Sequence, residues 1–208
     1  MLDKREHLLH SALPLFIAQG FHGTSVQTIV RAAGVATGSF YRYFDSKEAL
    51  ISALFRLVLG KICPLITADV DLQQVNFANY RQLWFNACVG IRDHTDVMFY
   101  KDLYERSPYF SPDDQAWALA QWAPLNAFFQ RGRDQGLFRN LPPMLLCTLS
   151  LASVHCVLHE QRFYDFELTD DLKAQMAEAS WQAILAANVA DHLTSNSVTS
   201  ANLRGSQE

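Results

Sequence analysis

Residues 24–50 read TSVQTIVRAAGVATGSFYRYFDSKEAL, and this stretch decides the fold. It opens on Thr24-Ser25-Val26-Gln27, a capping-box pattern of a hydroxyl residue followed three residues later by Gln, which predicts the start of a helix. Gly34 predicts the end of that helix, because a left-handed backbone is cheap only for glycine. A second, short helix is expected over Thr37–Tyr43, and Asp45-Ser46-Lys47-Glu48 predicts the start of a third.

The first two of these helices are expected to form a tight corner. Ala32-Ala33-Gly34 lets them approach closely, because these residues are small. Phe40 and Phe44 lie four residues apart and are expected to anchor the short second helix to the core. The other side chains of that helix are left to face outward: Thr37, Gly38, Ser39, Tyr41, Arg42 and Tyr43. A short exposed helix that begins with small and hydroxylated residues is suited to the major groove of DNA.

The flanking sequence also predicts helices. Upstream, apolar residues recur at the spacing of one helix face: Leu8, Leu9, Ala12, Leu13 and Phe16. Gly20 is expected to end this helix, and Pro14 predicts a kink or a lost hydrogen bond inside it. Pro64 is expected to bend or end the helix that begins near Asp45.

The remainder of the chain shows no hairpin dipeptide and no sustained alternation that would indicate a sheet. The expected helical segments are 75–94, 96–106, 113–135, 141–161 and 170–192. From Thr194 the chain is rich in Ser, Asn, Thr and Gly, which predicts a disordered tail. The sequence therefore predicts an all-α fold of about nine helices, with an N-terminal three-helix head and a C-terminal helical domain.

The composition is that of a soluble globular protein, with 208 residues, 50% of them hydrophobic and 18% charged. Four scattered cysteines without a CxxC pair fit a reducing cytosol, and no signal peptide is expected at the charged N-terminus, so a cytoplasmic location is predicted. Residues 141–158 lack charge and approach the length of a membrane span. Their prolines and hydroxyl residues favour a buried helix, and a membrane span is the weaker alternative.

The net charge of −4 alone argues against a protein that binds nucleic acid. The distribution of charge differs from the total, because residues 1–60 carry six basic and four acidic side chains. The rest of the chain carries eleven basic and seventeen acidic side chains. Any contact with phosphate is therefore expected from the N-terminal quarter, although an excess of two is also compatible with ordinary variation.

Over about residues 5–55 the chain resembles the TetR family of bacterial transcription regulators. The order and spacing of five motifs carry the resemblance: ALxLF (12–16), GFxGTSV (20–26), AAGV (32–35), GSFYRYF (38–44) and SKEAL (46–50). Residues 135–139, QGLFR before LPP, look like the family's connection between its seventh and eighth helices.

The resemblance implies that Thr37–Tyr43 is the recognition helix, with Thr37, Gly38 and Ser39 near the bases. Tyr41 and Tyr43 match positions that touch phosphate or sugar, and Lys47 matches a lysine that faces a phosphate. In the family, the start of the preceding helix, here Ser25 and Gln27, approaches the DNA backbone and nearby base edges. Arg42 belongs to the outward face of the recognition helix. The alternative is that the two tyrosines are half-buried packing residues and that Lys47 is a solvated cap.

Three positions depart from the family pattern. Ala36 replaces the usual Ser before the recognition helix, so Thr37 is expected to cap that helix instead. Gln27 stands where Arg is common, and Pro14 is unusual in the first helix. These changes bear on affinity and on the DNA sequence preferred.

The resemblance also implies a domain plan: 1–50 for DNA binding, 51–193 for ligand binding and dimerisation, and 194–208 as the tail. Segments 141–161 and 170–192 would form a four-helix bundle between two copies. Such a homodimer presents two recognition helices about 34–36 Å apart to a palindromic duplex. We expect a ligand-responsive regulator, most commonly a repressor, that a small apolar or aromatic effector releases from its operator.

The C-terminal part is dense in aromatic side chains that can line an effector pocket or simply fill a core. The candidate pocket residues are Phe85, Cys88, Phe99, Tyr104, Trp122, Phe128, His155 and His159. No cofactor is expected.

The competing interpretation is a metal- or thiol-dependent sensor or enzyme that uses His155, Cys156 and His159. Two histidines at i and i+4 can bind a metal, but there is no HExxH pattern and no evident third ligand. Buried or interface histidines are the simpler alternative. Neither a Gly-rich phosphate loop nor a GxSxG motif is found, so the sequence predicts neither a metal site nor an enzyme.

Overall fold

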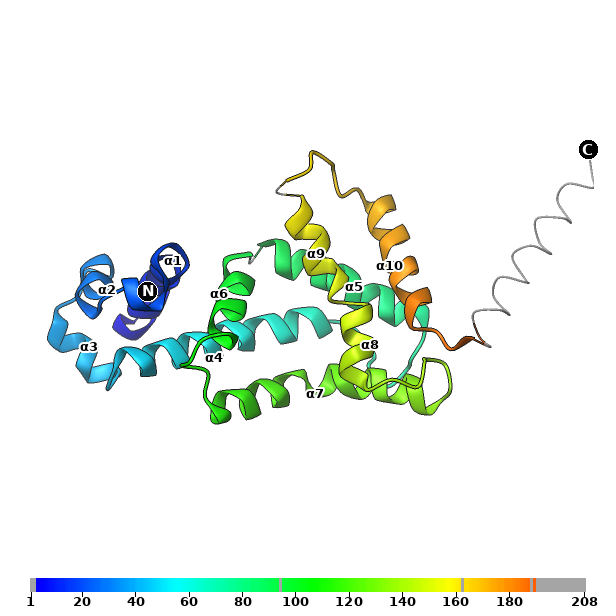
Figure 1. Cartoon of the computed structure of the whole chain (residues 1–208), viewed down its shortest axis with the longest axis horizontal. Helices are drawn as coiled ribbons and strands as arrows, with labels where there is room; N and C mark the ends of the chain where they lie inside the picture. The colour runs from blue at the N-terminus through cyan, green and yellow to red at the C-terminus, as the bar shows by residue number, and fades with distance from the viewer. Residues whose placement is uncertain (1–2, 94, 162, 188, 190–208) are drawn as a thin grey trace, which may run out of the picture. The chain divides into compact units, whose positions relative to one another are not determined.

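The computed structural model describes residues 3–93, 95–161, 163–187 and 189. Within these residues the regular secondary structure is helical, apart from one isolated bridge between Phe138 and Leu185 (Figure 1). Ten helical segments are present in the described chain, or nine when the consecutive segments within Pro143–Glu160 are counted as one helix. The predicted all-α fold of about nine helices is therefore confirmed.

The helices are α1 Lys4–Gly23, α2 Val26–Ala32, α3 Thr37–Tyr43, α4 Lys47–Thr67, α5 Phe77–Asp93, α6 Thr95–Glu105, α7 Pro112–Asp134, α8 Pro143–Leu149, α9 Ser153–Glu160 and α10 Asp170–Ile184. Most predicted boundaries agree to within two residues. The exceptions are α1, which continues to Gly23 past a kink at the predicted end Gly20, the early end of α10 and a break between α8 and α9. The expected tail, 194–208, lies outside the described residues.

The break between α8 and α9 comes from Ser150, whose backbone leaves the helical region at φ −116° and ψ −81°. Its hydroxyl donates a hydrogen bond to the carbonyl of Leu146 at 2.7 Å. The N–H of Ala152 then bonds the carbonyl of Cys147, one residue further back than in a regular α-helix. A serine hydroxyl that competes for backbone carbonyls explains why the segment predicted over 141–161 is interrupted.

Proline does not interrupt α1 or α4. Within α1 the single residue with non-helical dihedral angles is Gly20, at φ 69° and ψ 174°, so of the two effects expected at Pro14 the helix shows the lost backbone hydrogen bond. Pro14 and His10 are both exposed, and water can reach the turn whose hydrogen bond the proline removes. Helix α4 continues through Pro64 and ends three residues later.

The chain divides into two compact units. The first consists of residues 1–65 and 90–122, and the second of residues 66–89 and 123–208 as far as they are described. Each unit therefore takes part of α4, α5 and α7. The boundary differs from the sequence-based plan, because the DNA-binding motifs share a unit with α6 and with the first half of α7.

One hydrophobic core holds the first unit together. Helix α1 packs against α2, α3 and α6, and its residue Phe21 is only 5% exposed. The ring of Phe21 meets Tyr100 and Tyr104 of α6 edge-on, with centroids 5.8 and 6.2 Å apart. Edge-to-face pairs of this kind stabilise beyond their buried area. The three-helix head is thus packed on α6 as well as on α4.

Two stretches of the described chain, α4 and Pro143–Glu160, are long and apolar enough to cross a membrane by length and composition. Half of the most apolar window of α4 is buried in the protein, as in an ordinary core helix. For Pro143–Glu160 the buried share is 22%, so much of its apolar surface is uncovered in the single chain. One or two such helices are weak evidence for a membrane protein.

The second unit is organised around the ring of Phe138, which is 2% exposed. This ring contacts Trp181 at 5.1 Å, Phe129 at 6.0 Å and Phe128 at 6.3 Å between centroids. Gly132 of α7 lies against the same ring, and a Cβ added there would overlap it. The aromatic packing of α7 and α10 therefore requires glycine at this position.

Replacing Gly132 by Ala is expected to lower the free energy of unfolding by about 1–3 kcal/mol, because the buried ring of Phe138 must shift. Gly60→Ala is the matched control, since its Cβ would meet Trp117 at an ordinary 3.7 Å. In helix α4 that control is expected to be neutral or stabilising by about 0.5–1 kcal/mol. Chemical denaturation of both variants measures the difference, and equal stabilities would contradict the packing described.

Candidate nucleic-acid interface

Helix α2 begins one residue later than predicted. Ser25, not Thr24, is the N-cap, and its hydroxyl accepts the N–H of Thr28 at 3.1 Å. Thr24 is fully buried and donates its hydroxyl to the carbonyl of Gly20 at 2.9 Å. The predicted capping box is therefore wrong, because the third helical residue is Thr28 and not Gln27. Gln27 is left exposed on the outer surface of α2.

The turn between α2 and α3 matches the predicted corner. Gly34 has φ +66°, the left-handed conformation that favours glycine. Ala36 occupies the N-cap of α3 without a side-chain cap, and its carbonyl accepts the N–H of Ser39 at 2.8 Å. Thr37 is the first helical residue, so the expectation that it caps the helix is wrong. Its side chain is exposed instead.

One buried residue orients the seven-residue helix α3. Phe40 is 0% exposed and packs in the core of the first unit. Around it, Tyr41 is 58% exposed and Tyr43 36% exposed. The other outward residues are Thr37, Gly38 and Arg42, all exposed, and Ser39, which is partly buried. The burial of one phenylalanine thus leaves the rest of α3 at the surface.

The end of α3 carries a cation that the sequence did not single out. The guanidinium of Arg5 lies over the ring of Phe44, 5.3 Å from its centroid. Phe44 is the C-cap of α3 and is 5% exposed. The contact joins the start of α1 to the end of α3, and the charge cluster at residues 3–6 was the available signal. It places a positive charge beside the end of α3.

Lys47, at the start of α4, is held by backbone carbonyls. Its ammonium group donates to the carbonyl oxygens of Phe21 at 2.8 Å and Thr24 at 3.2 Å. An ammonium group has three donors, so one remains for another acceptor. Lys47 therefore fastens α4 to the turn between α1 and α2, a role the sequence did not predict.

The charges around this surface are mixed. Exposed Arg31 and Arg42 stand on α2 and α3, and exposed Asp45 and Glu48 stand beside Lys47. The pKa of Glu48 lies below its ordinary value, mainly because of a backbone hydrogen bond at the helix start and a second hydrogen bond with Ser46. Its carboxylate is therefore charged at neutral pH. The two arginines thus belong to α2 and α3, and the two carboxylates lie on either side of Lys47.

The candidate pocket residues are divided between the units. Phe99, Tyr104 and Trp122 belong to the first unit; Phe85, Cys88, Phe128, His155 and His159 belong to the second. In the second unit Cys88 and Phe128 are buried, Phe85 and His155 are half-buried and His159 is exposed. In the first, Phe99 is exposed, Trp122 is half-buried and Tyr104 is buried.

The alternative based on a metal or a reactive thiol gains no support from this geometry. Among the described residues there is no group of three or more His, Cys, Asp or Glu side chains that could hold a metal ion. His159 lies 3.7 Å from the carboxylate of its neighbour Glu160, and its ring contacts Phe163 at 5.1 Å.

Comparison with known families identifies the class of protein. Residues 8–54 match the family described as "Bacterial regulatory proteins, tetR family", and residues 76–185 match "Tetracyclin repressor-like, C-terminal domain". The second match alone spans more than half of the chain. The protein belongs to the TetR family of transcription regulators. Regulators of this family bind DNA as dimers, and they are not enzymes.

Individual relatives agree with this assignment. An uncharacterised HTH-type transcriptional regulator of Haemophilus influenzae is 25% identical over 182 residues, which cover 88% of this chain and 96% of the relative. The HTH-type transcriptional repressor DhaR of a Mycobacterium species is 28% identical, over 72% of this chain and 77% of its own. A TetR family regulator from Vibrio parahaemolyticus has a solved structure that superposes with a TM-score of 0.76 at 27% identity. The superposition covers 88% of this chain and 100% of that one.

Replacing Lys47 by Met should lower the free energy of unfolding by about 1–3 kcal/mol, because two backbone carbonyls lose a charged donor. The exposed Lys61 on the same helix provides the control, and Lys61→Met should be close to neutral. Thermal and chemical denaturation measure the effect. A Lys47→Met variant as stable as Lys61→Met would show that the two hydrogen bonds of Lys47 contribute nothing to stability.

Proposed function

We propose that this regulator binds operator DNA by inserting α3 into the major groove, with the start of α2 against the backbone. The observation that carries the proposal is the orientation of α3: Phe40 is buried while Thr37, Gly38, Tyr41 and Arg42 are exposed. A helix anchored by one side chain has the rest of its surface available to a groove. Base edges are read by the N-terminal residues of such helices.

The proposed contacts differ in kind. Thr37, Gly38 and Ser39 stand at the start of α3 and would lie nearest the bases. Tyr41, Arg42 and Tyr43 are assigned to phosphate or sugar, as are Ser25 and Gln27 at the start of α2. Lys47 can offer its third donor to a phosphate while it holds the carbonyls of Phe21 and Thr24. Phosphate contacts position the protein, and base contacts give the sequence preference.

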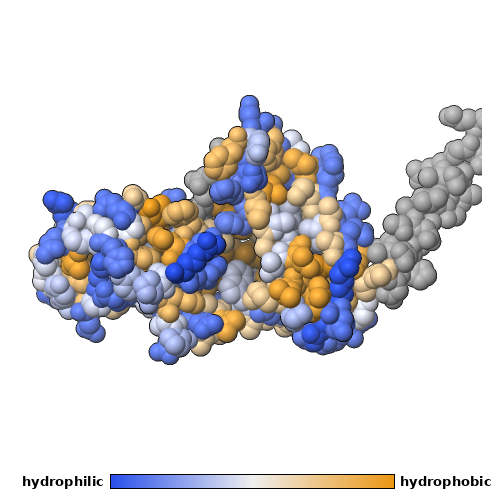
Figure 2. Space-filling model, viewed as in Figure 1, coloured by the Kyte–Doolittle hydropathy of each residue, from blue (hydrophilic) through white to orange (hydrophobic). Residues whose placement is uncertain are grey.

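We propose that the operator is palindromic and that two copies of the chain read it. The surface that favours a second copy lies on α8, where Met144, Leu145 and Leu149 are 43%, 49% and 51% exposed. Figure 2 shows hydrophobic residues gathered over this helix. Exposed apolar patches of this kind favour association with another protein surface. Helix α10 packs against α8 and would complete the bundle of four helices.

The ligand-responsive part of the proposal concerns residues 51–193, with 1–50 as the DNA-binding domain and a cytoplasmic location. A small apolar or aromatic effector would bind among the candidate pocket residues of the second unit and shift the dimer away from the spacing that DNA requires. The repressor DhaR is one relative, which supports repression as the sign of regulation. The buried aromatic side chains of the second unit, such as Phe128, support an apolar effector.

The DNA contacts are tested by selecting duplexes from a random library with the purified protein and measuring affinity by fluorescence anisotropy. Tyr43→Ala is expected to weaken binding to every duplex, by about tenfold or less, because it removes a backbone contact. Ser39→Ala or Thr37→Ala is expected to change which duplex is preferred. Lys61→Met, at an exposed position of α4 outside the proposed DNA contacts, serves as the control.

Two outcomes would contradict the assignment. One is an equal affinity of the wild-type protein for selected and scrambled duplexes. The other is an unchanged affinity of the Tyr43 and Ser39 variants, which would mean that α3 does not face the DNA.

The dimer surface is tested with Leu149→Glu, which places a charge on the exposed face of α8. Sedimentation or light scattering is expected to show a dimer for the wild-type protein and a monomer for the variant, with weaker DNA binding as a consequence. Leu119→Glu on α7 is the matched control, since Leu119 is 53% exposed. A Leu149→Glu variant that remains dimeric, or a monomeric wild-type protein, would refute this arrangement.

A further inference from the structure

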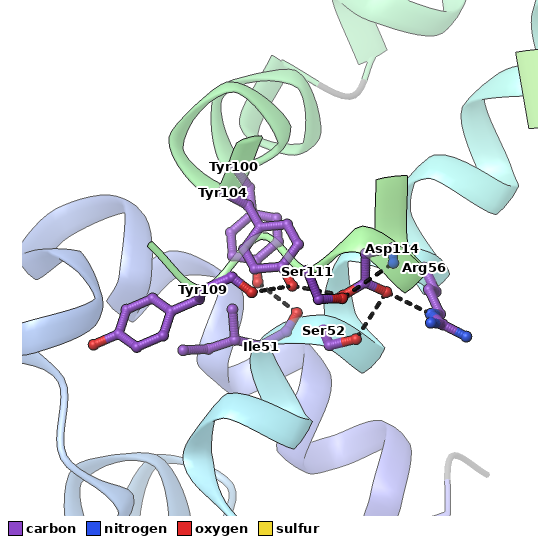
Figure 3. Close-up of polar contacts among 8 residues, drawn as sticks. All are labelled: Ile51, Ser52, Arg56, Tyr100, Tyr104, Tyr109, Ser111 and Asp114. Atoms are coloured by element: carbon purple, nitrogen blue, oxygen red, sulfur yellow. Dashed lines mark hydrogen bonds and ion pairs between the residues drawn. The ribbon is translucent and has the colours of Figure 1, made fainter. Parts of the chain in front are cut away.

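A carboxylate is buried in the first unit, at the start of α7. Asp114 is 1% exposed, and four side-chain donors surround its two oxygens (Figure 3). Oδ1 accepts the hydroxyl of Ser52 at 3.0 Å and Nε of Arg56 at 2.7 Å. Oδ2 accepts the hydroxyls of Tyr104 at 2.7 Å and Ser111 at 3.0 Å. We call these five residues the Asp114 cluster.

Burial and hydrogen bonding shift the pKa of Asp114 in opposite directions. Burial by itself raises the pKa of Asp114, but the hydrogen bonds from Tyr104, Arg56, Ser52 and Ser111 hold that pKa below its ordinary value. The carboxylate is therefore charged at neutral pH. A buried charge is costly unless it is paired and hydrogen-bonded, so each donor is needed. The loss of one donor leaves part of this charge unsatisfied.

The cluster joins α4 to α6 and the start of α7, although Ser52 and Asp114 are 62 positions apart in the chain. Ser52 and Arg56 come from α4, Tyr104 from α6, and Asp114 with its neighbour Ser111 from the start of α7. Ser111 also accepts the N–H of Asp114 at 3.1 Å, which caps α7. A parallel contact strengthens the junction, because the hydroxyl of Tyr100 donates to the carbonyl of Ile51 at 2.8 Å. Residues 51–56 of α4 are thus fixed against α6 and α7.

The same part of α4 leads directly to the DNA-binding surface. Ser52 stands five residues after Lys47, which holds the carbonyls of Phe21 and Thr24. Phe21 in turn packs edge-on against Tyr104 and Tyr109, at 6.2 and 5.7 Å. The hydroxyl of Tyr104 also reaches the carbonyl of Tyr109 at 3.0 Å. A continuous series of contacts therefore runs from Asp114 to the start of α2.

We propose that Asp114 is a positioning residue for DNA binding and that it acts through Tyr104, Ser52 and Arg56. In this proposal α6 and the first half of α7 belong to the DNA-binding domain. The inference rests on the proposed function and extends the DNA-binding domain beyond residue 50. Loss of a hydrogen bond in the cluster makes α4 and the turn before α2 more mobile. The two α3 helices of a dimer are then no longer held in the single orientation that fits both half-sites. Small displacements of recognition helices are costly because base contacts require close alignment.

Asp114→Asn keeps the shape of the side chain and removes its charge. In either orientation of the amide, one pair of donors faces an NH₂ group instead of an oxygen, because both carboxylate oxygens accept two bonds. Asp113→Asn is the matched control. Asp113 is exposed in the same first turn of α7. Its replacement removes a charge from this helix end and leaves the Asp114 cluster intact.

A second pair of variants separates positioning from general stability. Tyr104→Phe removes one hydroxyl that bonds Asp114 at 2.7 Å. Tyr80→Phe removes an equally buried hydroxyl, which bonds Ser180 at 2.7 Å in the second unit. Both variants lose a buried tyrosine hydroxyl, and Tyr104→Phe is expected to lose more stability because its partner is a charged carboxylate. A purely structural role predicts similar DNA affinities for the two folded variants.

The test measures thermal stability and anisotropy of the wild-type protein and four variants on a duplex selected by the wild-type protein. We expect Tyr104→Phe and Asp114→Asn to bind about tenfold more weakly, and Tyr80→Phe and Asp113→Asn to bind as the wild type does. Temperatures well below unfolding keep every variant folded. Equal DNA affinities for Tyr104→Phe and Tyr80→Phe would overturn the proposal.

Amide hydrogen exchange without DNA provides a readout that does not depend on the proposed function. Tyr104→Phe is expected to speed exchange in residues 47–56 and in the turn at 21–25, and Tyr80→Phe is expected to leave both segments unchanged. Unchanged exchange in Tyr104→Phe would refute the role of the cluster. A wild-type protein that binds no duplex, together with faster exchange in this variant, would instead refute the DNA-binding proposal alone.

Discussion

The burial of Phe40 is the constraint on which the proposed DNA-binding surface depends. Helix α3 has only seven residues, and Phe40 is its single fully buried side chain. Its position in the core decides which residues of α3 face outward. The left-handed Gly34 sets the direction from which the chain enters α3. A helix this short is marginal in isolation, so tertiary packing must supply its stability.

The packing that holds α3 extends well beyond the helix-turn-helix motif. Phe21 lies against tyrosines of α6, Lys47 holds the carbonyls at the end of α1, and Asp114 fastens α4 to α6 and α7. All of these contacts belong to one unit, which includes residues 90–122. The compact unit that contains α2 and α3 is therefore larger than the motif that identifies the family.

The sequence predicted the helices well and the individual contacts less well. The motif from Thr24 to Leu50 located α2, α3 and α4, because Gly34, the phenylalanine spacing and the hydroxyl residues are local signals. The cap of α2 was misplaced by one residue, because Thr24 and Ser25 are both hydroxyl residues and only packing buries the first. Asp114 was missed for a similar reason: beside the exposed Asp113 it reads as an ordinary acidic residue in the first turn of a helix. Two of its four donors, Ser52 and Arg56, lie 62 and 58 positions earlier in the chain, and no local pattern reveals such contacts.

The central claim is that the exposed side of α3 meets DNA while Phe40 stays in the core. Amide hydrogen exchange of the full-length protein, with and without a duplex that it selects, tests this claim most directly. The account predicts slower exchange on DNA binding in residues 25–28 and 37–43, and no comparable change in α10. Protection confined to other helices, with 37–43 exchanging at the same rate in both samples, would contradict it.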